Sequence, residues 1–342
     1  MKRMITYAKH FAVAVCLTQL PTLLRADGAD QAIDPVALEN WRAIMQQNLP
    51  QEAGCFHEQY PSLVREKVDC IAARPRVHPV HPAATAARPD DVGGGGPHDW
   101  VALTGGLTFW AGGSFLDAAA QSVTTVGGNN ATDGPNEYSL QINTNIDKKT
   151  SACSGSQFPS ACTVAQQFVY ATDDNFLPTG QVFMQYWLLD FGTCPGGDWN
   201  QFGPSCFVSS SAAPAPYFPI TDLANLSLHA GAQSGTQDCV VAYDNTGAGW
   251  GTCVPDSMLD ISSVWHWTEF GIFGDFGGSQ AQFSRIGGTS FTVLLQVNDG
   301  SSAAPTCVQN SFTGETNNLN LGKCEAFPSG SGLFPHIKFG EH

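Results

Sequence analysis

Residues 262–283 read S-S-V-W-H-W-T-E-F-G-I-F-G-D-F-G-G-S-Q-A-Q-F. Positions 264–273 have the density of β-branched and aromatic residues that is typical of a strand. Alternation with a period of two places four of them on one face: Trp265, Trp267, Glu269 and Phe273. One interpretation is an acid at a strand edge that meets solvent beside ordinary core aromatics. The other is a functional carboxylate on an aromatic-lined groove.

Short apolar or alternating runs recur from residue 99 to residue 342, separated by clusters of Gly, Pro, Asn, Asp and Ser. No long stretch has the 3.6-residue period of a helix. About 240 residues is a normal size for one large sandwich. We therefore predict an all-β domain over 99–342, built as a large antiparallel double-sheet sandwich.

Two further predicted strands carry polar side chains at informative positions. Residues 138–145 alternate, with Tyr138, Leu140, Ile142 and Thr144 facing inward and the residues between them facing outward. Residues 182–191 are apolar on both faces, except that Gln185 stands between Phe183 and Trp187. Three strands thus offer Gln141, Gln185 and Glu269. A solvated face position is the alternative for Gln141.

The first residues have the pattern of an export signal. Lys2, Arg3 and Lys9 precede an apolar run over 11–20, and small residues follow. We predict a signal peptide over 1–26 and a secreted protein, extracellular or periplasmic. A signal-anchor is the alternative, although the run is shorter than the ~18 apolar residues of a membrane span.

Cysteine usage agrees with export. Of eleven cysteines one, Cys16, lies in the predicted signal, and the other ten fall into neighbouring pairs. We predict five local disulfides in an oxidising compartment: 55/70, 153/162, 194/206, 239/253 and 307/324. None of these pairs has the spacing of a zinc site, so we expect no metal.

The front of the chain differs from the rest. Residues 31–49 have helical apolar spacing, with Asp34 as cap, Pro35 in the first turn and an expected apolar stripe: Val36, Leu38, Trp41, Ile44 and Met45. A Cys-bounded piece follows, and 76–98 is a Pro-, Ala- and Gly-rich linker. We predict that 27–75 is a small separate unit, either a propeptide or an accessory domain. The arginines at 74, 76 and 88 offer cleavage points, which favours the propeptide.

The formal charge is −15, and 13 % of residues are charged against a typical ~25 %. So few Lys and Arg argue against nucleic acid or an anionic membrane as partner. An acidic, Lys-poor and disulfide-rich composition suits a protein that works in acid. We also expect a monomer.

Several hydrolase classes lack their motifs in this sequence. There is no G-x-S-x-G of a serine hydrolase and no H-E-x-x-H of a zinc peptidase. Each cysteine of the mature chain has a predicted disulfide partner, so a cysteine nucleophile is not expected. The glycine run at 93–96 lacks the strand–helix context of a phosphate loop. We expect no cofactor. Carboxylate chemistry on a sheet remains.

Four short motifs then give a resemblance. L-Q-I-N-T-N at 140–145 resembles the L-Q-T-G-V-D strand of the eqolisins, the acid-acting glutamic endopeptidases. T-E-F at 268–270, followed by G-D-F at 274–276, is similar to that family's A-E-W-I-V-E-D segment. Q-Y-W at 185–187 resembles its Y-E-W strand, and 282–292 is similar to its F-G-x-V-x-F-T ending. Asn143, Phe270 and Phe273 stand where the family has Gly, Trp and Glu.

The resemblance implies a lectin-like (concanavalin-like) double sheet with Gln141 and Glu269 as catalytic pair. Glu269 would activate a water as general base and then protonate the leaving amine. Gln141 would orient that water and donate to the oxyanion. Gln185, Trp187 and Trp267 would bind an extended peptide.

Two other classes remain open. The same sheet could be a non-catalytic carbohydrate-binding module, because Trp, Tyr, Asn and Gln side chains also suit a glycan. The chain could equally be an exported structural or interaction protein. A glycosidase needs two facing carboxylates, and no second one shares a predicted strand face with Glu269.

Overall fold

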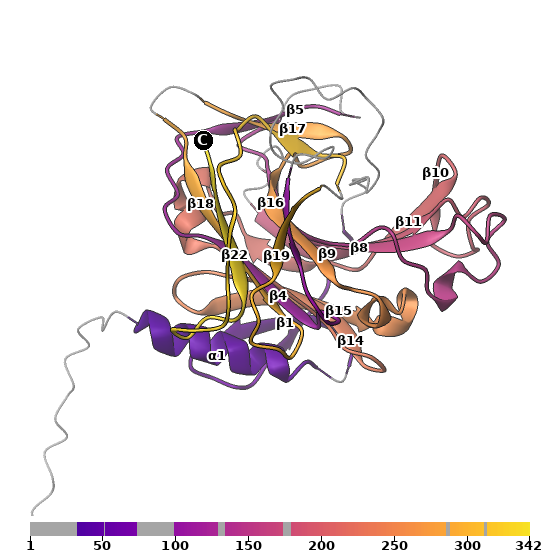
Figure 1. Cartoon of the computed structure of the whole chain (residues 1–342), viewed down its shortest axis with the longest axis horizontal. Coiled ribbons are helices and arrows are strands. Elements are labelled where there is room, and N and C mark those ends of the chain that lie inside the picture. The colour runs from indigo at the N-terminus through magenta and orange to yellow at the C-terminus, as the bar shows by residue number, and fades with distance from the viewer. Residues whose placement is uncertain are drawn as a thin grey trace, which may run out of the picture. The chain divides into compact units, whose positions relative to one another are not determined.

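Two large antiparallel sheets make up most of the computed structural model (Figure 1), which describes residues 33–50, 52–73, 99–128, 134–173, 179–284, 288–310 and 313–342. Sheet I contains, in order, β2 (Glu66–Val68), β1 (Gly54–Gln59), β15 (Ala248–Pro255), β14 (Gln237–Tyr243), β13 (Ser227–Ala232), β4 (Trp110–Phe115), β18 (Phe291–Asn298), β22 (His336–Glu341) and β21 (Glu325–Phe327). Sheet II contains β10 (Asn200–Phe202), β11 (Ser205–Ser209), β9 (Thr179–Leu189), β8 (Thr163–Asp173), β7 (Ser139–Thr144), β16 (Trp267–Phe273), β3 (Trp100–Leu103) and β19 (Thr306–Gln309), with β12 (Ala213–Pro216) also paired to β9. The smaller sheet III contains β20 (Thr316–Asn317), β17 (Ser279–Phe283), β5 (Val123–Gly127) and β6 (Gly134–Pro135). The predicted all-β sandwich is confirmed.

The main core lies between sheets I and II and follows from the alternation of each strand. Leu140 and Ile142 of β7 and Phe270 of β16 have no solvent exposure and belong to it. From the opposite sheet, Phe115 places its ring centroid 5.2 Å from that of Phe270. Since successive side chains alternate, Gln141 and Glu269 lie on the other face of sheet II, as the sequence predicts.

The structure corrects the predicted face of residues 264–273. Strand β16 begins at Trp267, because η4 (Ile261–Ser263) and the turn after it break the alternation: the Trp265 amide donates to the Ile261 carbonyl at 2.9 Å. Trp265 therefore turns into the core and stacks on Phe168 at 5.6 Å. Of the two tryptophans, only Trp267 stays on the face of Glu269, so the carboxylate is not flanked by two indoles.

The front segment is part of the sandwich where the structure describes it. Residues 54–59 pair with 248–253 of β15, and the compact unit that includes them runs from Asp34 to His342. This differs from the expectation of a separate front unit, because β1 uses the free edge of β15. Whether the segment is removed as a propeptide stays a prediction.

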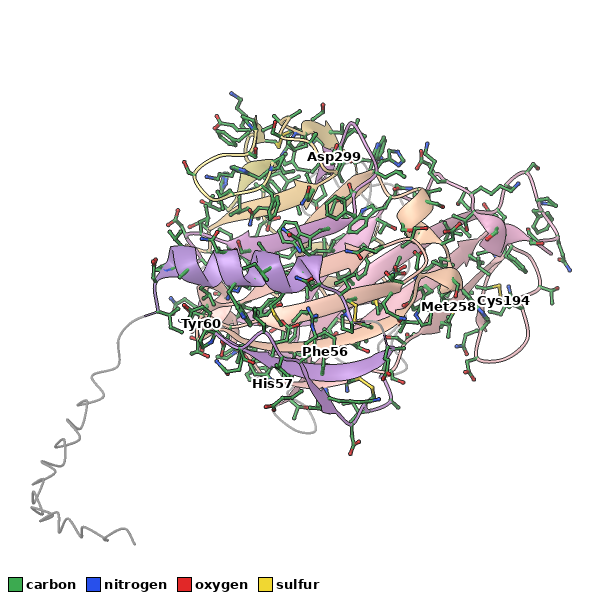
Figure 2. All side chains as sticks on the ribbon, turned by 90° about the horizontal axis from the view of Figure 1, so that it is seen from below. Phe56, His57, Tyr60, Cys194, Met258 and Asp299 are labelled. Carbon is green, nitrogen blue, oxygen red and sulfur yellow. A yellow bond between two sulfur atoms is a disulfide. The ribbon has the colours of Figure 1, made fainter. Side chains whose placement is uncertain are left out.

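Helix α1 (Pro35–Gln47) covers the outer face of sheet I (Figure 2), and Asp34 caps it as predicted. Trp41 packs edge-on against Tyr243 of β14, with ring centroids 5.7 Å apart. The predicted stripe is only partly right, since Val36 and Ile44 are 60 % and 46 % exposed. Arg42 and Gln46 are buried with the stripe because both find polar partners. Arg42 donates to the Asp244 carbonyl at 2.5 Å, and Gln46 donates to the Tyr243 hydroxyl at 3.1 Å.

All five predicted disulfides are present: Cys55–Cys70, Cys153–Cys162, Cys194–Cys206, Cys239–Cys253 and Cys307–Cys324. Five disulfides indicate an oxidising compartment. The predicted signal peptide (1–26) and linker (76–98) lie outside the described residues. Within the described part of the chain, no helix is both long and apolar enough to span a membrane.

Candidate functional site

A row of polar side chains crosses the outer face of sheet II in direct register. Backbone pairing sets β16 opposite β7, β7 opposite β8, β8 opposite β9 and β9 opposite β11. Directly opposite residues of antiparallel strands share a face, with Cβ atoms about 4.5–5.5 Å apart. The members of this polar row are, in order, Glu269, Asn143, Gln167, Gln185 and Ser209.

Gln141 lies beside the polar row on the same face. It is opposite Gly271 of β16 and two residues from Asn143, which makes it the diagonal neighbour of Glu269. Diagonal neighbours are about 7–8 Å apart, within reach of long side chains. The structure thus brings the two predicted catalytic residues onto adjacent strands and one face. Gln185, the predicted substrate-binding residue, lies two strands from Asn143.

Hydrogen bonds fix the direction of the Gln141 amide. The indole Nε1 of Trp187 donates to Gln167 Oε1 at 3.0 Å, and Gln167 Nε2 donates to Gln141 Oε1 at 3.1 Å. Gln141 Nε2 in turn donates to Ser139 Oγ at 3.0 Å, and that hydroxyl donates to the Gly274 carbonyl at 2.9 Å. The indole can only donate and the carbonyl can only accept. Both ends of the chain of hydrogen bonds therefore require that Gln141 accepts on Oε1 and donates from Nε2.

Glu269 is held by its neighbour in the row. Asn143 Nδ2 donates to Glu269 Oε2 at 2.8 Å, and both residues have no solvent exposure. The other polar atom of that amide, Asn143 Oδ1, is buried without a hydrogen-bond partner among the described residues. Buried side-chain acceptors are usually satisfied by protein or ordered water, so this oxygen is an exception that needs a cause.

Aromatic rings close one end of the face. Trp187 is 1 % exposed, stacks on Phe207 at 5.2 Å and meets Phe202 edge-on at 5.6 Å. Its ring faces are thus occupied by β10 and β11, and its polar atom supports Gln167. Trp267 is only partly buried and packs on the same apolar cluster as Trp187.

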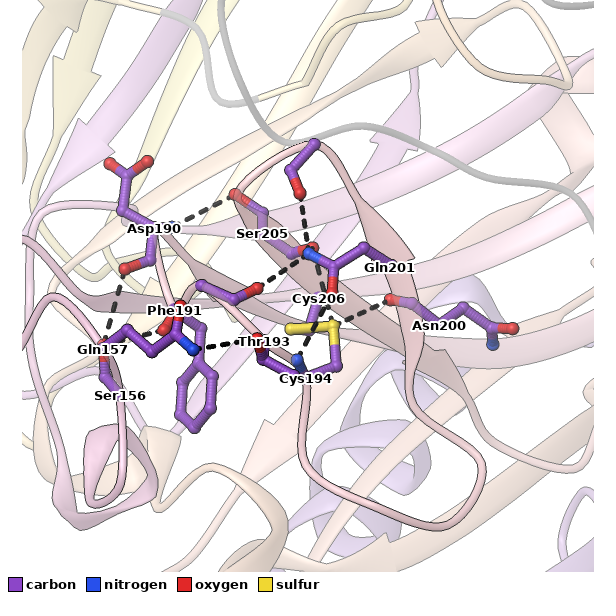
Figure 3. The surroundings of a disulfide bond; sticks show 12 residues. Ser156, Gln157, Asp190, Phe191, Thr193, Cys194, Asn200, Gln201, Ser205 and Cys206 are labelled. Atoms are coloured by element: carbon purple, nitrogen blue, oxygen red, sulfur yellow. Dashed lines mark hydrogen bonds between the residues drawn. A yellow bond between two sulfur atoms is a disulfide. The ribbon is translucent and has the colours of Figure 1, made fainter.

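Strands β10 and β11 form the hairpin that carries Phe202 and Phe207. This hairpin is held in place near the Cys194–Cys206 disulfide (Figure 3). Gln201 Nε2 donates to the carbonyls of Gly192 and Ser205 at 2.8 and 3.2 Å, and Gln201 Oε1 accepts from the Cys194 amide at 3.3 Å. Ser205 Oγ accepts from the Asp190 amide at 3.1 Å. One disulfide and one amide therefore fix the position of the hairpin beside Trp187.

The centre of this face is closed to solvent. Gln141, Gln185 and Glu269 have no solvent exposure. Two cavities, of about 590 Å³ beside α1 and about 230 Å³ beside β1, have no lining residue from the polar row. The front segment reaches the edge of this face: Ile71 and Ala212 exchange two backbone hydrogen bonds of 2.9 Å, and Ala73 packs on the apolar cluster of Val169 and Phe183.

Sequence reasoning missed three members of the arrangement. Gln167 and the role of Asn143 follow from strand register, which joins residues far apart in the chain, whereas Ser139 is the residue of β7 next to Gln141 on the same face. The alternation of 163–173 was available as a signal for Gln167. As for metals, no group of three His, Cys, Asp or Glu side chains in the described ranges could hold an ion.

Comparisons with known proteins add a remote structural similarity. No protein-family model matches the chain, and no curated protein matches it. Two solved structures of scytalido-glutamic peptidase are similar, one with a transition state analog inhibitor and one with a peptide-based transition state analog. In each case the identity is 12 %, the TM-score is 0.31, and the match covers 73 % of this chain and 98 % of that chain. Likeness at this level carries no argument about the site.

Proposed function

We propose that this chain is a secreted, acid-acting endopeptidase of the glutamic type, in which Glu269 and Gln141 activate water. The observation that carries the proposal is the placement of these two side chains on one face of the paired strands β7 and β16. The motif resemblance at 140–145 and 268–270 supports the same pair. The proposed substrate is an extended peptide, and the proposed working form is a monomer that uses neither nucleic acid nor membrane.

In the proposed reaction, ionised Glu269 takes a proton from a water as the water oxygen adds to the scissile carbonyl carbon. The carbonyl oxygen becomes an oxyanion, and Gln141 donates to it from Nε2. This nitrogen is directed by the bond that Oε1 accepts from Gln167. One such donor contributes about 3–4 kcal/mol to transition-state stabilisation. When the C–N bond breaks, the proton on Glu269 passes to the leaving amine.

Because Gln141 and Glu269 have no solvent exposure, a substrate reaches them only after a change that uncovers them. We therefore propose that the full chain is latent and is processed between residues 73 and 99. The sequence prediction of a propeptide supports this part of the proposal.

The test is cleavage of an unfolded protein substrate between about pH 2 and about pH 7, by the full chain and by chain cut within 74–98. We expect cleavage in acid by the cut chain, and a loss of more than about 1,000-fold in Glu269→Gln. Glu325→Gln, at an exposed glutamate of β21, is the matched control and should keep activity. No cleavage by correctly folded, cut wild-type chain at any pH overturns the proposal.

Carbohydrate binding is the second candidate. The planar amides of the polar row and the partly exposed ring of Trp267 favour it, whereas the occupied ring faces of Trp187 do not. A lectin-like protein would bind glycans without cleaving peptides, and Glu269→Gln would largely keep that binding. A glycan-binding screen on the same cut chain separates the two functions.

A further inference from the structure

We infer that Asn143 is a substrate-binding residue of this site and also positions Glu269. The inference rests on the proposed function and extends it to a residue that acts with both partners. The two polar atoms of the Asn143 side-chain amide have different surroundings.

The amide nitrogen is committed to Glu269. Nδ2 donates to Oε2 at 2.8 Å, and an ionised carboxylate can only accept. This bond fixes the flip of the Asn143 amide, so Oδ1 points away from the carboxylate. It also holds Glu269 in one orientation on the face that carries Gln141.

The amide oxygen is the observation that points to a ligand. Oδ1 is buried, and no described residue donates to it. A buried carbonyl oxygen without a donor lowers stability, and native proteins keep such groups mainly where a ligand, ion or ordered water satisfies them. Since the oxygen can only accept, the matching ligand group is an N–H or O–H donor.

A main-chain N–H of an extended peptide fits this requirement. Asn143 and Gln141 are alternate residues of β7, so their side chains are about 7 Å apart along the strand. That is also the spacing between alternate N–H groups of an extended peptide. A peptide whose scissile carbonyl lies between Gln141 and Glu269 can therefore place a neighbouring N–H on Asn143 Oδ1.

The experiment compares Asn143→Leu and Asn143→Asp with wild type in the chain cut within 74–98. Peptide substrates are tested beside ester analogues in which one main-chain N–H at a time is replaced by oxygen. Wild type should lose roughly 3–10-fold in kcat/KM for the ester at one position, the fold-change typical of one neutral hydrogen bond. Asn143→Leu should be about 10–100-fold less active and show no further loss with that ester.

The conservative variant separates positioning from a general structural effect. In acid the carboxyl group introduced by Asn143→Asp is protonated, so it offers both an O–H donor for Glu269 and a carbonyl acceptor for the substrate. This variant should therefore recover most of the activity that is lost in Asn143→Leu. Asn200→Leu, at an exposed asparagine of β10, is the control and should match wild type.

The outcomes separate this inference from the proposed function. If cut wild type is active and depends on Glu269, but both Asn143 variants keep the wild-type kcat and KM and the same ester penalty, the inference alone is wrong. If Asn143→Leu loses activity yet keeps the full ester penalty at every position, Asn143 does not bind substrate. If folded, cut wild type cleaves no peptide, both the inference and the proposed function are wrong.

Discussion

The indole nitrogen of Trp187 lies 3.0 Å from Oε1 of Gln167 and donates to it. Trp187 is two strands away from Gln141, and Gln167 lies on the strand between them. Because an indole cannot accept, this contact sets the flip of the Gln167 amide and, through it, the flip of Gln141. The direction of a candidate oxyanion donor is thus determined by a residue that the sequence suggested only as a groove wall.

Replacing Trp187 with Phe tests whether its indole sets the orientation of the Gln167 and Gln141 amides. The ring keeps its stacking on Phe207, but Gln167 Oε1 loses its donor. We expect a loss of about 1–2 kcal/mol in the free energy of unfolding, and about a tenfold fall in kcat with a smaller change in KM. Trp41→Phe removes an indole donor of similar geometry, 2.7 Å from the Ser62 carbonyl, on the helix side of sheet I. Trp41→Phe should lower the free energy of unfolding without lowering kcat. An equal fall in kcat in this variant would contradict the role of the Trp187–Gln167 hydrogen bond in orienting Gln141.

Two buried carboxyl groups, those of Asp238 and Glu341, should each stabilise the fold more in acid than at neutral pH. Burial raises the pKa of Asp238 well above its usual range, and the neighbouring Asp256 raises it further; burial also raises the pKa of Glu341 to about 8. The folded chain therefore holds protons that the unfolded chain releases above about pH 4. This contribution to stability is complete below that pH and is lost as the pH rises toward about 8. Each such group gives a slope of up to ~1.4 kcal/mol per pH unit.

Denaturant unfolding at a series of pH values checks this expectation. Asp238→Asn and Glu341→Gln should each reduce the fall of the free energy of unfolding with rising pH, because each replaces a buried carboxyl group by an amide that does not titrate. Asp117→Asn, at an exposed position, should leave the slope unchanged. The same dependence of the free energy of unfolding on pH in both variants as in wild type would contradict the assignment.

The parts of this molecule that sequence predicts are those set by local pattern. Alternation over 138–145 placed Leu140 and Gln141 on opposite faces correctly, and short cysteine separations gave all five disulfides. The alternation pattern predicted the wrong face for Trp265, because the turn at η4 interrupts the period of two before β16 begins. It could not find the Asn143–Glu269 bond, because partners 126 residues apart meet only through strand register.

The same limit explains the front segment. Its composition and the linker after it suggested independence, but nothing local predicts that 54–59 pairs with 248–253. The segment pairs with the edge of β15 and contacts the buried Tyr243, and both partners are formed only in the folded sheet.

The front segment should stay bound at neutral pH after the linker is cut. Its own disulfide, Cys55–Cys70, closes within the segment, so only non-covalent contacts join it to the remainder. These include six residue pairs with β15 and the buried carboxylate of Glu58, which accepts from the Tyr243 hydroxyl. We expect both fragments to co-elute in gel filtration at neutral pH after a site-specific protease cuts an inserted site within 76–98, and to separate in denaturant.

Two substitutions sharpen that measurement. Arg42 of the segment donates to the Asp244 carbonyl of the remainder at 2.5 Å, so Arg42→Ala should lower the denaturant concentration at which the fragments separate. Lys67→Ala changes a side chain that is 76 % exposed and should not. Release of the segment in neutral buffer without denaturant would contradict this prediction.

Gly113 of β4 shows how closely the two sheets approach beneath the candidate site. A Cβ at this position would lie 2.3 Å from ring carbons of Phe270, the residue that follows Glu269 in β16. Since both backbones belong to central strands, the ring has to move, and overpacking of this kind typically costs about 1–3 kcal/mol. We expect Gly113→Ala to lower the free energy of unfolding by that amount, and to reduce activity because β16 carries Glu269. Gly105→Ala, where no atom lies within 4 Å of the new Cβ, should be neutral or slightly stabilising. The double variant Gly113→Ala/Phe270→Leu should recover part of the loss, because the smaller side chain makes room for the methyl group. If Gly113→Ala unfolds at the same denaturant concentration as wild type, the packing of β4 against β16 is looser than this structure has it.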